Sequence, residues 1–135
     1  MTRPLMGKLG DSLQDNLIAG PRFPIAHKGV TLAAGNGYVG RGTVLGIITV
    51  DGLAVAVNSS LSNGAQSPDC ILAEDIDTGA IPGGDGIPAV AYSAGYFIRN
   101  SLIFGGTDTF ENHETEMRKL NMHLSSSVDM DGGVR

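Results

Sequence analysis

The chain has 135 residues, of which 41% are hydrophobic and 17% charged, and its formal net charge is −5 at pH 7. This length fits one domain with its own core, while an acidic chain with scattered Lys and Arg argues against nucleic-acid binding, because phosphate neutralisation needs clustered positive charge. The single cysteine, Cys70, excludes an internal disulfide, and no apolar run makes a signal peptide or approaches the ~20 residues of a membrane helix.

The first twenty residues are predicted to form an arm. Its apolar residues are spread among Gly, Asp, Gln and Asn, and only Leu9, Leu13 and Leu17 have a helical spacing. Gly7 and Gly10 oppose a long stable helix, because glycine has a high entropic cost in a helix interior. We expect a flexible arm that is poorly ordered in the free monomer and apolar enough to dock on a partner.

After the arm the pattern changes to that of β-strands. Val30–Leu32 ends in a turn signal at residues 33–37, and Asp51-Gly52 separates the apolar runs Val44–Val50 and Leu53–Val57. Asp-Gly between two such runs predicts a hairpin with a type I′ turn, in which both central residues adopt positive φ. The 20 glycines of the chain are typical of a β-rich domain with many tight turns.

The second half of the chain predicts further short strands between polar loops. The loops cover residues 58–69 and 77–88, and the second loop is rich in Gly and Pro, which favours an exposed, flexible segment. Gly95 and Asn100-Ser101 are expected to mark bends or bulges. The predicted strands are Cys70–Ala73, Ala89–Tyr92, Tyr96–Ile98 and Leu102–Phe104.

One helix is predicted near the C-terminus. Asp108 is the expected N-cap with Glu111 three residues later, and Met117, Leu120 and Leu124 form a narrow apolar stripe. The predicted organisation is therefore an arm over residues 1–20, a mainly β domain with one short C-terminal α-helix over 21–124, and a flexible polar tail over 125–135.

Several sequence patterns carry possible chemistry, and each has a simpler interpretation. Gly35-x-Gly37-x-x-Gly40 matches a dinucleotide-binding pattern, but no helix is predicted to begin there, so we expect a turn. His113-Glu114 begins like a zinc-protease motif, but Met117 stands where the second histidine is required. We therefore interpret the helical histidines, which include His123, as exposed side chains.

The remaining reactive side chains also favour structural roles. Strand alternation would put Asp75 and Asp77 on one face and offer oxygen ligands for a cation, although a solvated strand end is the preferred interpretation. Cys70 has no basic neighbour in sequence to lower its pKa, so we expect a small buried apolar residue. No nucleophile, base and oxyanion donor assemble into a catalytic set. The sequence predicts no enzyme, cofactor site or metal site.

Three segments, the first of them in two stretches, together resemble the lambda-type bacteriophage head decoration protein family. Read in chain order, they are similar to the family patterns L-x-A-G followed by R-G-x-V-L-G, P-x-x-I-L-A-E-D-V-D, and V-x-x-x-G-x-F. The resemblance covers about residues 17–124, and the order and spacing of the segments are more specific than any one of them. The residues that carry it are Val30–Gly35, Arg41–Ile47, Pro68–Asp77 and Ala89–Phe97.

The resemblance implies a β-clip or β-barrel-like fold and a structural role on a virion. It implies homotrimers at threefold or quasi-threefold sites on the outside of the expanded head, reinforcement of the shell, and an N-terminal arm that contacts the major capsid protein. It also implies synthesis in the bacterial host cytoplasm, in agreement with the lone cysteine, and no nucleic-acid or membrane partner.

The arm suggests how such binding would work. We expect its apolar residues to become ordered on binding and to add a strand to an exposed edge of the capsid protein. Two other classes stay open at this point: a tail or baseplate component of the virion, and a small β-fold ligand-binding protein or enzyme with a polar pocket. The expected capsid-contact residues are Leu13, Leu17, Ile18, Phe23 and Ile25.

Overall fold

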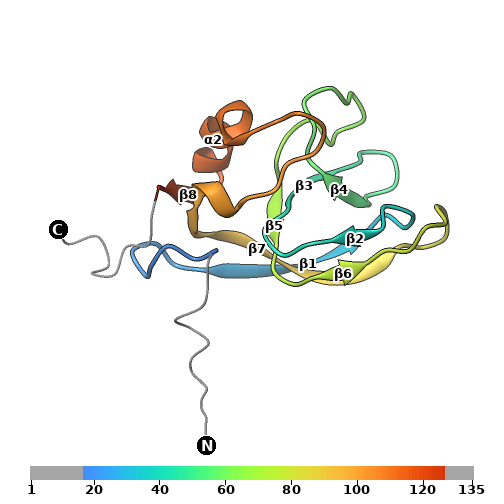
Figure 1. The fold of residues 1–135 in the computed structure, drawn as a ribbon, viewed down its shortest axis with the longest axis horizontal. Coiled ribbons are helices and arrows are strands. Elements are labelled where there is room, and N and C mark those ends of the chain that lie inside the picture. The colour runs from blue at the N-terminus through green and yellow to red at the C-terminus, as the bar shows by residue number, and fades with distance from the viewer. Residues whose placement is uncertain (1–16, 127–135) are drawn as a thin grey trace, which may run out of the picture.

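The computed structural model describes residues 17–126, which form a mainly β domain (Figure 1). Five strands close into a barrel in the order β1-β4-β3-β5-β7, and β7 pairs back onto β1. All neighbours in this ring are antiparallel except β1 and β4. The barrel strands are β1 (Ala26–Leu32), β3 (Val44–Ile47), β4 (Ala54–Ala56), β5 (Cys70–Leu72) and β7 (Ile87–Ile98).

The other elements lie around this barrel. A two-stranded sheet joins β2 (Tyr38–Val39) to β6 (Ile76–Asp77), and β8 (Met122–Ser125) extends the main sheet by pairing in parallel with the end of β7. A 3-10 turn, η2 (Arg99–Ser101), leads towards the helix α2 (Phe110–Lys119). The predicted mainly β, barrel-like fold with one short C-terminal helix is confirmed. Within residues 17–126, no helix is long and apolar enough to cross a membrane.

The predicted hairpin around Asp51-Gly52 is confirmed as β3 and β4, with Leu45 opposite Ala56. The expected type I′ turn is wrong, because among these two residues only Gly52 has a positive φ, at 74°. The Ile48 carbonyl accepts a hydrogen bond from the Gly52 amide at 2.8 Å, so the loop is longer than two residues and needs one left-handed position only.

The two strands predicted at residues 89–92 and 96–98 are a single strand, β7, of 12 residues. Continuous pairing with β1, β5 and β8 supplies hydrogen-bond partners along its whole length, which overrides the local glycine signal. The irregularity expected at Gly95 lies two residues earlier: the register shifts between Ala26 and His27, so that Ser93 has no opposite residue. At 102–104, only Ile103 forms an isolated bridge, to Thr43.

The helix begins one residue later than predicted and ends at Lys119, before the last residue of its predicted apolar stripe, Leu124. Thr109 is the N-cap, and its side chain accepts from the Glu111 amide at 3.3 Å while the Asn112 side chain accepts from the Thr109 amide at 2.7 Å. Asp108 is not the cap, because its carboxylate bonds a distant loop. The helix ends at Lys119, Asn121 takes a left-handed φ of 69°, and the chain turns into β8.

The predicted apolar stripe of the helix is therefore only partly correct. Met117 is fully buried, but Leu120 is 44% exposed, and Leu124 belongs to β8. The core consists of two clusters of buried apolar residues. One contains Leu17, Val44, Val57, Ile71, Phe97, Met117 and Met122, and the other contains Leu32, Leu45, Ala54, Cys70, Leu72, Ala89 and Ala91.

Candidate functional site

The residues singled out for metal or nucleotide chemistry have structural roles. Among the described residues, no group of three His, Cys, Asp or Glu side chains is placed to hold a metal ion. Asp75 accepts from the Arg41 amide at 2.6 Å, Asp77 accepts from the Gly79 amide at 2.9 Å, and exposed Glu74 caps an amide of β7. This is the solvated strand end that the sequence predicts. The turn predicted at Gly35 and Gly37 connects β1 to β2, and Tyr38–Val39 form β2 instead of opening a helix.

Cys70 is fully buried in β5, which confirms its predicted role as a small core residue. Burial, and next the neighbouring Asp69, raise the pKa of the thiol to about 12 from an ordinary 9.0. A thiol that stays protonated is a poor nucleophile. Because the folded pKa exceeds the unfolded one, this group contributes stability below pH 9 that is lost as the pH rises towards 12.

We predict that the Cys70 thiol of the native protein does not react with a thiol reagent at neutral pH. It should react fully once the chain is unfolded in urea, which serves as the control. Mass spectrometry of the alkylated protein measures both states. Rapid labelling of the native protein would show that β5 opens locally and that the thiol is accessible.

A buried polar cluster, which sequence reasoning missed, joins the loop after β4 to the helix. The Asp108 carboxylate accepts from the Ser59 hydroxyl at 2.7 Å and from the Ser59 amide at 2.6 Å, and the oxygen that binds this amide also lies 2.6 Å from Nε2 of His113. The side chains of Asp108 and His113 are only 6% and 3% exposed. The prediction that His113 and His123 are exposed helix residues is wrong, since His113 is buried and His123 lies in β8.

The electrostatics of this cluster favour an ionised carboxylate. Burial opposes ionisation of Asp108, but the hydrogen bonds from Ser59 and His113 outweigh it and hold the pKa of the carboxyl below its ordinary 3.8. An ionised carboxylate has no proton to donate, so Nε2 of His113 carries the proton of their shared bond. In a catalytic triad the serine hydroxyl donates its hydrogen bond to the histidine. Here the Ser59 hydroxyl donates to the Asp108 carboxylate, so the histidine does not activate it as a nucleophile. The cluster holds the loop after β4 against the start of the helix.

The segment that enters the domain from the N-terminal side is fastened to β7. The Leu17 carbonyl accepts from the Ile98 amide at 2.7 Å, the Ala19 amide donates to the Tyr96 carbonyl at 2.8 Å, and Ile18 lies opposite Phe97. Leu17 is only 3% exposed and packs in the core. These residues of the predicted arm therefore act as its anchor on the barrel.

The other expected contact residues lie beside this anchor. Phe23 stacks on the His123 ring with centroids 3.8 Å apart and meets the Tyr96 ring edge-on at 5.0 Å. Ile25 is 43% exposed. Leu13 lies outside the described residues. The structure thus brings Leu17, Ile18, Phe23 and Ile25 to one end of the barrel.

Both ends of the described chain leave the barrel at this same end. Ile18 and Leu124 flank Phe97 from opposite sides, because β8 pairs in parallel with the end of β7. Figure 1 shows the N- and C-terminal sides of the described chain at the end of the barrel opposite the loop between β6 and β7. We name this region, defined by Ile18, Phe23, Ile25 and His123, the terminal surface.

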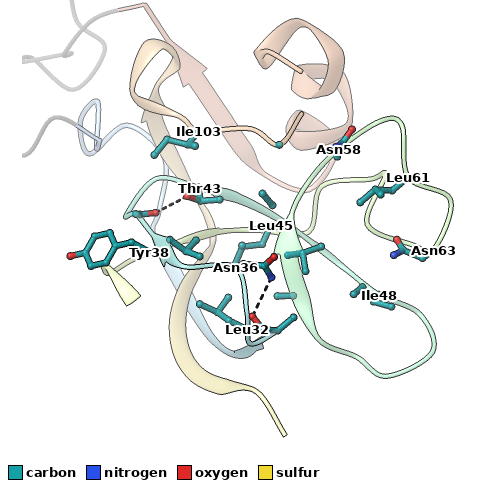
Figure 2. A pocket seen from close by; sticks show the side chains of 17 residues that line it. Leu32, Asn36, Tyr38, Thr43, Leu45, Ile48, Asn58, Leu61, Asn63 and Ile103 are labelled. Carbon is teal, nitrogen blue, oxygen red and sulfur yellow. Dashed lines mark hydrogen bonds between the residues drawn. The ribbon is translucent and has the colours of Figure 1, made fainter. Parts of the chain in front are cut away.

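A groove of about 550 Å³ lies on the side of the barrel, between β2, β4 and the loop after β4 (Figure 2). Its walls are aliphatic, with Tyr38 and Ile103 at the rim, exposed by 71% and 46%. Asn36, Asn58 and Asn63 are its polar side chains besides Thr43 and the Tyr38 hydroxyl. No charged residue lines it within the described part of the chain. Sequence reasoning did not find this groove, since its walls come from segments far apart in the chain.

Comparison with known protein families identifies the chain. No curated protein matches it. The family model described as Bacteriophage lambda head decoration protein D matches residues 8–123, which is most of the chain and nearly all of the described domain. The matched residues include the barrel, the terminal surface and the helix. The chain therefore belongs to the bacteriophage lambda head decoration protein D family.

Proposed function

We propose that the protein binds the major capsid protein on the outside of the expanded phage head, as a homotrimer at threefold or quasi-threefold sites, and reinforces the shell. The family match over residues 8–123 is the observation that carries this proposal. The family is a family of head decoration proteins, so the role is structural. The protein would be made in the host cytoplasm and reside on the outer capsid surface.

The terminal surface supports an anchored arm as the means of attachment. Leu17 and Ile18 fix the point from which the preceding residues leave the barrel, because the hydrogen bonds to β7 lie at this position. Leu13, Phe23 and Ile25 are then the residues proposed to contact the capsid protein directly. A fixed exit point limits the volume that the arm has to search, which lowers the entropic cost of docking.

Trimerisation would let arms that bind weakly one at a time hold the protein firmly on the head. One arm that becomes ordered on binding loses conformational entropy, so it binds weakly alone. Three arms on one trimer raise the effective concentration of the second and third after the first has docked. Each bound trimer would then connect neighbouring capsid subunits. Selectivity for the expanded shell follows if only that state exposes the edge that the arm recognises.

We predict that deleting residues 1–16 abolishes binding to expanded heads and leaves the domain folded. The deletion keeps Leu17, which packs in the core, whereas removing Leu17 as well would damage the fold and confuse the result. Binding is measured by co-sedimentation with expanded heads that lack decoration protein, and folding by circular dichroism.

The matched control is deletion of residues 127–135, which follow β8 in the sequence. This variant should bind heads as the full chain does. Undiminished binding after removal of residues 1–16 would reject the arm as the attachment. Electron microscopy of virions with a tagged chain tests the wider proposal, since label on the tail or baseplate would contradict a head location.

A further inference from the structure

The sequence contains two Asn-Gly pairs, Asn36-Gly37 and Asn63-Gly64. Asparagine before glycine is prone to deamidation, because glycine has no side chain to hinder the attack of its amide nitrogen on Cγ of the asparagine. Both asparagines are exposed, so access to water does not distinguish the two pairs. The hydrogen bonds of the atoms that would react do distinguish them.

At Asn63 these hydrogen bonds favour the reaction. The Ala65 amide donates to Oδ1 of Asn63 at 3.1 Å, which polarises the side-chain carbonyl and stabilises the negative charge that develops on this oxygen during attack. The Gly64 amide donates to Oε1 of exposed Gln66 at 2.8 Å, so the attacking nitrogen is bonded only to a surface side chain. Nδ2 of Asn63, which would leave as ammonia, makes no hydrogen bond within residues 17–126.

At Asn36 the corresponding atoms are held in place. Its Nδ2 donates to the Ala33 carbonyl at 3.3 Å, as Figure 2 shows, and no group in the described part of the chain donates to its Oδ1. The Gly37 amide donates to the Gly79 carbonyl at 2.9 Å, and the Gly37 carbonyl accepts from the Thr78 amide at 2.7 Å. Rotation of Gly37 towards the asparagine side chain would break these backbone bonds.

We infer that Asn63 is a site of spontaneous deamidation and that the fold protects Asn36. The Gly64 nitrogen loses its proton to a base in solution and bonds to Cγ of Asn63, the Cγ–Nδ2 bond breaks, and Nδ2 takes up a proton and leaves as ammonia. The product is a cyclic imide. Water then opens this ring at one of its two C–N bonds, which gives aspartate or, where the chain continues through the side-chain carboxyl, isoaspartate.

The reaction changes both the groove and the loop after β4. Asn63 lines the groove, which has no charged lining residue in the described part of the chain, and the new carboxyl is ionised at neutral pH. Isoaspartate also lengthens the backbone where space is short, since a Cβ on Gly64 would lie 2.5 Å from the Ile47 carbonyl oxygen. The Asn63 carbonyl accepts from the Thr49 amide at 2.8 Å, and the longer backbone displaces this bond.

Peptide mapping of the aged protein tests the inference. Trypsin cleaves after Lys28, Arg41 and Arg99, so Asn36 and Asn63 fall in different peptides. After incubation of the native protein at mildly alkaline pH, mass spectrometry should show conversion of Asn63 to the acid at least about tenfold faster than conversion of Asn36. In urea both pairs should react at similar rates, because neither then keeps its hydrogen bonds. Equal rates in the native protein, or faster conversion of Asn36, overturn the inference.

Matched glutamine variants test the assignment in the intact protein. Glutamine keeps the amide, but its longer side chain forms a cyclic imide far more slowly. Isoelectric focusing should show an acidic species that accumulates with time in the wild type and in Asn36→Gln, and that is absent from Asn63→Gln. An acidic species that accumulates equally in Asn63→Gln, when circular dichroism shows this variant to be folded, would assign the reaction to another residue.

Discussion

Replacing Phe97 with alanine should destabilise the domain by about 3–5 kcal/mol, the cost of removing a large aromatic side chain from a packed core. Phe97 is fully buried, and its ring centroid lies 5.6 Å from that of Tyr92. In β7, Phe97 pairs with Ile18 on one side and with Leu124 on the other. The loss of this side chain therefore loosens both ends of the described chain at once. Urea unfolding followed by circular dichroism measures the change.

Phe110→Ala is the matched control for Phe97→Ala. Phe110 is the first residue of α2, is only partly buried, and has the Arg99 guanidinium 5.2 Å from its ring centroid. We expect a loss of about 1 kcal/mol there, the size of a partly exposed cation–π contact. A Phe97→Ala loss no larger than that of the control would contradict the placement of Phe97 at the centre of the core.

Asp108→Ala should cost about 2–4 kcal/mol of stability, because it leaves the buried His113 ring and the Ser59 amide without their shared acceptor. The effect should depend on pH. The folded pKa of Asp108 lies below its ordinary 3.8, so the stabilisation is fully present above that pH and is lost as the pH falls through the folded pKa. The difference between wild type and variant should be constant near neutral pH and shrink in acid.

Asp51→Ala controls for the loss of an exposed carboxylate. Asp51 accepts one hydrogen bond, from the Leu53 amide at 3.0 Å, on an exposed loop, and its removal should cost less than about 1 kcal/mol. Urea denaturation of both variants at several pH values measures the differences. An Asp108→Ala penalty that does not diminish in acid would show that the cluster stabilises the fold by packing and not through the ionised carboxylate. Glu114 contributes to the wild-type acid sensitivity as well, since its hydrogen bond with Arg99 holds its pKa below 4.5.

Short sequence segments were sufficient to predict the strands and turns whose physical cause lies within the segment itself. The Val44–Val57 hairpin, the buried strand at Cys70 and the turn at Gly35 and Gly37 follow from β-branched runs, apolar runs and positive-φ glycines in sequence, and all three are present. The resemblance to head decoration proteins also depends on the order of short segments along the chain, and the family match confirms it.

Contacts between segments far apart in the sequence explain the features that no short segment could predict. β7 is continuous because β1, β5 and β8 pair along it, and Leu17 is a core residue because Phe97 lies opposite its neighbour Ile18. Asp108 leaves the cap position because its carboxylate bonds Ser59, 49 residues away. The groove likewise arises where segments distant in sequence meet. Most strands and turns and the family could thus be read from the chain alone, whereas long-range hydrogen bonds and burial established the barrel closure, the attachment of Leu17 and Ala19 to β7, and the buried polar cluster.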